Sequence, residues 1–248
     1  MTAQIPRPPS ARPGAPAPWA GLPADARRGL TVSSVVGAMA AAGRTGSIGQ
    51  LVAEPMAGPA VVGAPPPVVP VPTEPLPAAV LVAVFEEAGE ARVLLTRRAA
   101  TLRSHRGEVS FPGGRVEPGE HVVAAALREA EEEVGLAVDA VRPVGWLRPL
   151  PAFSSRSWIT PIVGLLDDRP VVVPSADEVA RVFDVALADL LDEGVFHEER
   201  WVRDDGPVPG SPDASYPVWF FAVATEVVWG ATARMLVDLL SVVLRLGG

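Results

Sequence analysis

The sequence predicts an α/β sandwich with a mixed β-sheet, and two observations lead to this prediction. Short runs rich in β-branched and aromatic residues, typical of strands, are mixed irregularly with segments whose apolar residues recur at helical spacing, and no βαβ unit repeats. In addition, most of the 28 prolines precede Pro77, in runs such as PRPPSARPGAPAP that lack the backbone donors a packed helix or sheet needs. The packed domain therefore begins at about Ala78.

We expect residues 1–77 to form a Pro/Ala-rich, largely disordered tail and residues 78–248 to form one domain. The tail includes a possible short helix at about residues 23–43. Part of it, the apolar stretch after Arg27 and Arg28, resembles an export signal, but about 26 residues precede these arginines, unlike an ordinary signal. A short Ala-rich helix is the simpler interpretation.

The domain opens with two apolar, β-branched runs at residues 78–85 and 91–98, separated by the turn-like EEAGE, which predict a β-hairpin. An amphipathic helix follows between Pro118 and Gly135, opened by Pro-Gly and closed by Gly. Its apolar residues recur at helical spacing: Val123, Leu127, Ala130 and Val134.

The rest of the chain alternates between strands and helices. A final helix at residues 231–246 keeps helical periodicity, so we expect one of its faces to pack on the sheet. A short helix is expected at residues 186–194 from ALADLLDEG. The predicted strands are residues 141–150, 158–166, 178–185, 198–204 and 216–224.

Charge and composition exclude several classes of function. A net charge of −8 argues against nucleic-acid binding, which needs many Lys and Arg contacts to phosphates, and favours a small-molecule substrate. The absence of cysteine excludes disulfides and thiolate metal sites and fits a reducing compartment, so we expect a cytoplasmic protein. No apolar run is long enough to span a bilayer, and we expect no membrane partner.

The helix between Pro118 and Gly135 also carries a group of carboxylates. Glu132 and Glu133 lie three and four residues after Glu129, so the three share a face opposite the apolar stripe. Their charges repel one another unless a cation binds. Hard oxygen ligands suit Mg²⁺ or Mn²⁺. The alternative is an ordinary solvated, Glu-rich helix face, which these residues alone would favour.

The surrounding sequence resembles the Nudix family, whose motif specifies a loop, a turn and a helix together. The motif falls on this chain without gaps, with Ala130 smaller than the usual aliphatic residue. The matched residues are Gly114, Glu120, Arg128, Glu129, Ala130, Glu132, Glu133, Gly135 and Leu136. The resemblance implies a Nudix-type α/β/α sandwich that hydrolyses a phosphoric anhydride with the help of divalent metal ions.

The resemblance also implies a role for each matched residue. Glu129 and Glu133 are expected to be the main metal ligands, with Glu132 as a further ligand or as the base that activates water. Arg128 is expected to pair with Glu120 and so orient the helix against its loop. Gly113 and Gly114 are expected to allow a tight backbone at the pocket edge.

Immediately upstream, LLTRRAATLRSHRGEVSFPGG resembles the additional motif of the coenzyme A pyrophosphatase branch of the family. The residues that fill it are Leu94, Leu95, Thr96, Arg98, Ala99, Arg103, Gly107, Phe111, Pro112, Gly113 and Gly114. Arg98 and Arg103 are candidates for contacts to substrate phosphates, because arginine forks bind phosphate well. The alternative is that both are solvated or paired with a surface glutamate.

Further downstream, DEVARVF and WGATARML also resemble parts of this branch, so the resemblance covers most of the chain from Ala78 onward. Glu178, in the first of these segments, is expected to be a further metal ligand or base; the alternative is a loop carboxylate that caps a strand or helix.

Three functions follow as hypotheses. The first is hydrolysis of coenzyme A or acyl-coenzyme A to 3′,5′-ADP and 4′-phosphopantetheine or its acyl form. The second is a broader pyrophosphatase for ADP-ribose, NADH or nucleotides. The third is a binding module without turnover, which the retention of Glu129, Glu132 and Glu133 together disfavours. A homodimer is possible, since Nudix domains often dimerise.

Overall fold

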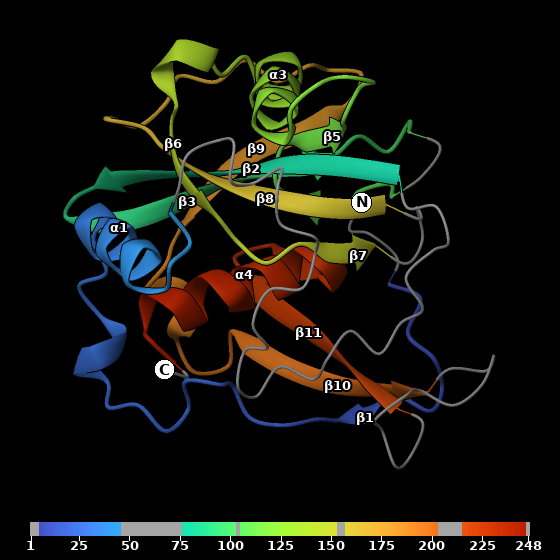
Figure 1. Ribbon diagram of the computed structural model, residues 1–248. Coiled ribbons are helices and arrows are strands. Elements are labelled where there is room, and N and C mark those ends of the chain that lie inside the picture. Colours follow the sequence, from blue (N-terminus) through green and yellow to red (C-terminus); the bar gives the residue numbers. More distant parts are fainter. Residues whose placement is uncertain (1–4, 46–75, 103–104, 153–156, 203–214, 247–248) are drawn as a thin grey trace.

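The computed structural model describes residues 5–45, 76–102, 105–152, 157–202 and 215–246 (Figure 1). Its main sheet has eight strands in the order β4-β3-β2-β8-β6, with β5 paired to β2, β7 to β8 and β9 to β3. The bounds are β2 (Leu76–Glu87), β3 (Glu90–Arg98), β4 (Val109–Ser110), β5 (Gly113–Arg115), β6 (Arg142–Trp146), β7 (Leu150–Ala152), β8 (Ser157–Leu165) and β9 (Val179–Ala186). Since β2 and β8 run parallel and the other pairs antiparallel, the predicted mixed sheet is confirmed.

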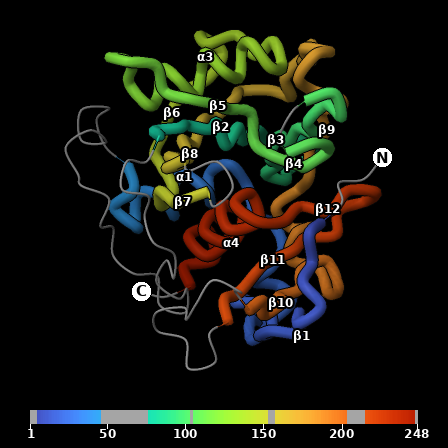
Figure 2. Tube along the Cα trace, turned by 90° about the vertical axis from the view of Figure 1, so that its right-hand side faces the viewer, coloured from blue at the N-terminus to red at the C-terminus, as the bar shows by residue number. Residues whose placement is uncertain are grey.

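A second sheet has four strands in the order β1-β10-β11-β12. Its bounds are β1 (Arg12–Pro13), β10 (Phe196–Val202), β11 (Ser215–Val223) and β12 (Glu226–Trp229). The helices are α1 (Val32–Ala41), α3 (Val122–Val134) and α4 (Gly230–Val243), with 3₁₀ turns η1 (Asp25–Arg27), η2 (Val138–Ala140) and η3 (Asp189–Leu191). Figure 2 shows the second sheet at the end of the molecule opposite α3.

Alternation along β2 places the eight-stranded sheet between two layers of helices. Ala79 and Leu81 face α3 and its buried Ala126, whereas Val80 and Val82 face the core that α4 completes. The two faces follow directly from the two-residue period of a strand. In Figure 1, α3 accordingly lies on one side of the sheet, and α4 lies on the other.

The predicted hairpin is confirmed as the β2–β3 pair, and the two longer predicted helices of the domain are confirmed as α3 and α4. Helix α3 starts at Val122, because Pro118 and Gly119 form a turn and the side chain of His121 accepts the N–H of Val123 as a cap. It ends at Gly135, whose φ of 68° is the left-handed conformation of a helix C-terminus.

One local expectation was wrong, and one strand was not predicted. The segment ALADLLDEG forms only the 3₁₀ turn η3, because Leu190 and Leu191 both point into the core and Gly194, with φ of 83°, turns the chain into β10. The chain also forms β12 directly before α4, where only four residues, EVVW, separate a turn from the helix. Such a short run carries too little periodicity to predict a strand.

Residues 5–45 pack against the domain, which differs from the predicted disordered tail. Trp19 and Met39 are buried in the core, and β1 pairs with β10. Helix α1 lies within the predicted range of 23–43, and Thr31 and Ser34 cap its start reciprocally. A few large apolar residues among the prolines therefore suffice to anchor this segment. For residues 46–75, the tail prediction lies outside the described residues.

In the described parts of the chain, no helix has both the length and the apolar character needed to cross a membrane.

Candidate active site

Glu133 is the most deeply buried carboxylate of the predicted site. Its side chain is 3% exposed, and one oxygen accepts the backbone N–H of Gly113 at 3.2 Å. The other oxygen lies 3.5 Å from Nη1 of Arg98, at the end of β3. Burial raises the pKa of Glu133 to about 7; the negative charges of Glu129 and Glu178 act in the same direction, while Gly113 and Arg98 oppose them.

Glu129 lies one helical turn before Glu133, on the same face of α3. Burial also raises the pKa of Glu129, and the charges of Glu132 and Glu178 raise it further, against the effect of Arg128. Its carboxylate lies against Gly114 of β5: a Cβ added at this glycine would be 2.4 Å from the carboxyl carbon of Glu129. The glycine therefore leaves room for the carboxylate at the edge of the sheet.

Arg128 ties the helix to the preceding loop, and the predicted pairing with Glu120 is confirmed. Its Nε and Nη2 atoms donate to the two oxygens of Glu120 at 2.9 and 3.1 Å. Nη1 also donates to Glu129 at 3.0 Å and to Glu132 at 3.1 Å, and Nη2 donates to the carbonyl of Arg115 at 3.0 Å. These hydrogen bonds raise the pKa of Arg128 and lower that of Glu120. Arg128 therefore orients α3 relative to β5.

Glu132 is more exposed than a shared helix face with Glu129 and Glu133 predicts, and Glu178 lies on the segment before β9. The side chain of Glu132 is 60% exposed and forms an ion pair with Arg128. Glu178 precedes β9 and is exposed, but its charge acts on both Glu129 and Glu133. Backbone hydrogen bonds connect the segment of Glu178 to helix α3. The N–H of Ser175 donates to the carbonyl of Glu133, and the N–H of Glu178 donates to the carbonyl of Ser175. Glu178 therefore lies near enough for its charge to act on Glu129 and Glu133, although the three carboxylates do not form a ligand group among the described residues.

The backbone at Gly113 and Gly114, which we call the glycine loop, has little free space around it. A Cβ at Gly113 would be 2.4 Å from the carbonyl oxygen of Ala79 and 2.5 Å from Cα of Val80, so only glycine fits this pairing with β2. The predicted tight backbone at Gly113 and Gly114 agrees with these distances.

Arg98, one of the two candidate phosphate ligands, lies beside the carboxylate of Glu133. Arg98 faces Glu133, and its Nε atom is buried with no hydrogen-bond partner within the described ranges. The sequence did not predict the contact of Arg98 with Glu133, which depends on the register of the hairpin. Arg103 lies outside the described residues.

The chemistry of the donor set fits a hard divalent cation. Carboxylate oxygens are the ligands that Mg²⁺ and Mn²⁺ prefer, and Glu129, Glu133 and Glu178 carry like charges whose proximity a cation would offset. Among the residues described, no three such side chains already form a ligand set. Arg128 and Arg98 contact the carboxylates of Glu129 and Glu133.

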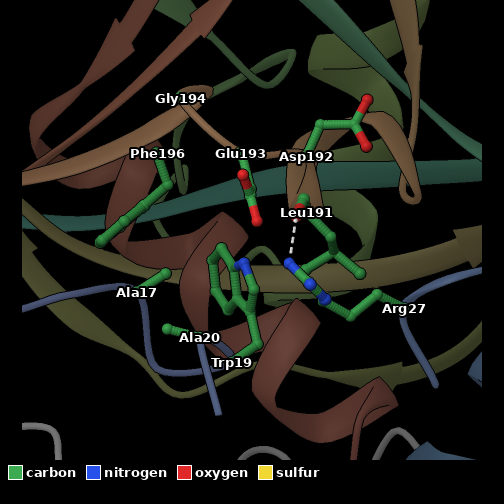
Figure 3. A pocket seen from close by; sticks show the side chains of 9 residues that line it. All are labelled: Ala17, Trp19, Ala20, Arg27, Leu191, Asp192, Glu193, Gly194 and Phe196. Carbon is green, nitrogen blue, oxygen red and sulfur yellow. Dashed lines mark hydrogen bonds between the residues drawn. The ribbon is translucent and has the colours of Figure 1, made fainter. Parts of the chain in front are cut away.

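A cavity of about 120 Å³ lies elsewhere, between the N-terminal segment and the loop after η3 (Figure 3). The indole of Trp19 and the guanidinium of Arg27 face each other across it, and Arg27 donates to the carbonyl of Leu191 at 3.3 Å. None of the predicted site residues that the structure describes lines this cavity.

A glycine loop packed against a glutamate-bearing helix, beside a mixed sheet, defines the class of this protein. The family model described as the NUDIX domain matches residues 75–205. The chain belongs to the Nudix family, and it is a hydrolase that acts on phosphoric anhydrides. Members of this family generally use divalent metal ions and small-molecule substrates.

Individual relatives carry the same family name. The chain is 39% identical over 145 residues to a Photorhabdus laumondii protein named uncharacterized Nudix hydrolase NudL, covering 58% of this chain and 73% of the relative. It is 35% identical over 165 residues to Nudix hydrolase 3 of Caenorhabditis elegans, covering 63% and 69%. Among solved structures, a C. elegans Ap4A hydrolase complex is 25% identical with a TM-score of 0.40, covering 45% of this chain and 81% of that one.

Proposed function

We propose that this Nudix hydrolase cleaves the pyrophosphate bond of coenzyme A or acyl-coenzyme A. One water is consumed, and the products are 3′,5′-ADP and 4′-phosphopantetheine or its acyl form. The observation that carries the proposal is that Glu133 contacts both Gly113 and Arg98, two residues of the motif that resembles the coenzyme A pyrophosphatase branch. This motif therefore borders the carboxylates instead of lying on a remote surface.

Glu129 and Glu133 would hold the Mg²⁺ or Mn²⁺ ions. The bound ions supply Lewis-acid chemistry and a nucleophilic water at neutral pH. Arg128 keeps α3 aligned with the glycine loop through Glu120. Glu178 or Glu132 would accept a proton from the attacking water.

Arg98 would bind a phosphate oxygen of the substrate. Its guanidinium is 25% exposed, lies beside Glu133 and has a buried Nε atom with no partner among the described residues. A guanidinium suits this task because its planar fork matches two oxygens of a phosphate. Arg103, from the same motif, is a second candidate.

A comparison of kcat/KM tests the substrate assignment. Coenzyme A and acetyl-coenzyme A should give larger values than ADP-ribose, NADH and nucleoside triphosphates with the same metal ion. A larger value for ADP-ribose or NADH would indicate the broader pyrophosphatase. Tight binding without turnover for every substrate and metal would instead indicate a binding module.

A further inference from the structure

A second charged cluster lies on the face of the main sheet opposite Glu133. It consists of Arg44, Arg148 and Arg234 around Asp238, and we refer to it as the arginine cluster. Arg234 and Asp238 belong to α4, which packs on the face opposite α3 (Figure 1). Arg44 follows α1, and Arg148 lies between β6 and β7.

Asp238 is already fully engaged by two of the arginines. Arg44 forms a bidentate ion pair with Asp238, with Nη1 2.6 Å from Oδ2 and Nη2 3.1 Å from Oδ1. Arg148 donates its backbone N–H to Oδ2 at 2.8 Å and approaches Oδ1 with Nη2 at 3.4 Å. The side chains of Arg44, Arg148 and Asp238 are 16%, 26% and 13% exposed. The side chains of this ion-pair network are therefore largely buried.

The arginine cluster carries more positive charge than Asp238 can neutralise. Arg234 is one helical turn before Asp238 and partly buried; burial lowers its pKa, Arg148 lowers it further, and Asp238 raises it. Within the described part of the chain, every ion pair of the cluster ends on Asp238. Three guanidinium groups and one carboxylate leave a net charge of +2 in a protein whose total is −8.

The position of Arg44 is fixed by close packing of the backbone. Its carbonyl accepts the N–H of Trp146 at 3.2 Å, and a Cβ at Gly145 would be 2.2 Å from that same carbonyl oxygen. To hold this backbone in place, a single ion pair of Arg44 with Asp238 is sufficient. A third arginine adds repulsion, since a guanidinium does not lose its proton in a protein.

We propose that the arginine cluster binds a phosphate group at a site separate from the carboxylate site. A phosphate dianion would balance the net charge of +2, and guanidinium forks match its oxygens. The shared chemistry is a terminal phosphate, from free inorganic phosphate or from the monoester of a nucleotide.

The test measures binding of inorganic phosphate to the full chain in EDTA, with ionic strength held constant by chloride. Phosphate should raise the melting temperature of the wild-type protein along a saturating curve. Arg234→Met should need at least about tenfold more phosphate for the same rise, because it removes one guanidinium and leaves in place Arg44 and Arg148, which bind Asp238. Arg142→Met, at an exposed arginine of β6, is the matched control and should behave like the wild type.

Equal phosphate curves for Arg234→Met, Arg142→Met and wild type would overturn the proposal, provided that circular dichroism shows all three to be folded. A second arm uses AMP and 3′,5′-ADP at the same ionic strength. Binding that is lost in Arg234→Met and is tighter for a nucleotide than for inorganic phosphate supports a monoester occupant; equal affinities support free phosphate. The measurement needs no turnover, so its result is independent of the proposed hydrolysis.

Discussion

The carboxylate of Glu133 lies 3.5 Å from the guanidinium of Arg98, although 35 positions separate them in the chain. The β2–β3 hairpin places the end of β3 beside the C-terminal half of α3 and so produces this contact. One arginine at this distance does not compensate for burial, and the pKa of Glu133 remains raised to about 7. The charged form of Glu133 consequently lowers the stability of the folded protein until a cation binds.

The first prediction concerns stability of the metal-free protein. With a folded pKa of about 7 against an ordinary 4.5, the folded state holds a proton that the unfolded chain releases. Stability should therefore fall by about 1 to 3 kcal/mol as pH rises from below 4.5 through 7. Glu133→Gln should remove this part of the fall. Urea unfolding in EDTA at several pH values measures it.

His105, whose pKa is raised by its hydrogen bond to Glu108, contributes a fall of the same sign in both proteins and cancels in the comparison. Identical pH slopes for wild type and Glu133→Gln would contradict the first prediction.

The second prediction concerns the glycine loop. Gly114→Ala would displace the carboxylate of Glu129 and should lower metal affinity and kcat/KM by at least about tenfold with the fold retained. Gly113→Ala meets backbone instead and should destabilise the protein by about 2 kcal/mol or more. Calorimetric metal titration and thermal unfolding measure these effects.

Gly37→Ala is the control for the loop, because nothing lies within 4 Å of its added Cβ in α1; it should leave activity unchanged and stabilise the protein by about 0.5 to 1 kcal/mol. Unaltered metal affinity in Gly114→Ala would show that the glycine does not make room for Glu129.

The third prediction separates the two candidate bases. Glu178→Gln should lower kcat by at least about 100-fold, since the charge of Glu178 acts on Glu129 and Glu133. Glu132→Gln should have a smaller effect, because its side chain is 60% exposed and pairs with Arg128. Steady-state kinetics with saturating metal compare the two variants. A larger loss in Glu132→Gln would reverse the assignment.

The fourth prediction concerns the N-terminal segment. The indole of Trp19 is 2% exposed, stacks on Phe221 at 6.2 Å and meets Phe196 edge-on at 5.2 Å. Trp19→Ala should therefore destabilise the whole domain by about 3 to 5 kcal/mol in a single unfolding transition. Leu76→Ala, at a residue 42% exposed, should change stability little. Equal stability of both variants would show that residues 5–45 are not part of the cooperative unit.

Periodicity predicted the elements that are long and strongly patterned. The hairpin was predicted from two long apolar, β-branched runs around a turn, and helices α3 and α4 from apolar residues at helical spacing over two or more turns. Strand β12 and turn η3 are too short for any pattern. Helix α1 lies within the predicted range of 23–43, but the packing of the N-terminal segment on the domain was not predicted, because its prolines outnumber the few residues, such as Trp19 and Met39, that anchor it.

The candidate site was predictable only where its residues lie in one helix. Helical spacing placed Glu129 and Glu133 on one face, and the pairing of Arg128 with Glu120 followed from the family motif. The contact of Arg98 with Glu133 required the hairpin register, which spacing does not give. The outward position of Glu132 was equally hidden, since it depends on competition for Arg128.

Product analysis by mass spectrometry tests the central claim most directly. Purified protein is incubated with coenzyme A and Mg²⁺ or Mn²⁺, beside a Glu133→Gln control and an EDTA control. We predict metal-dependent release of 3′,5′-ADP and 4′-phosphopantetheine in equal amounts, lost with EDTA and reduced at least about 100-fold in Glu133→Gln. Intact coenzyme A, or equal release by Glu133→Gln, would contradict the proposed reaction at these carboxylates.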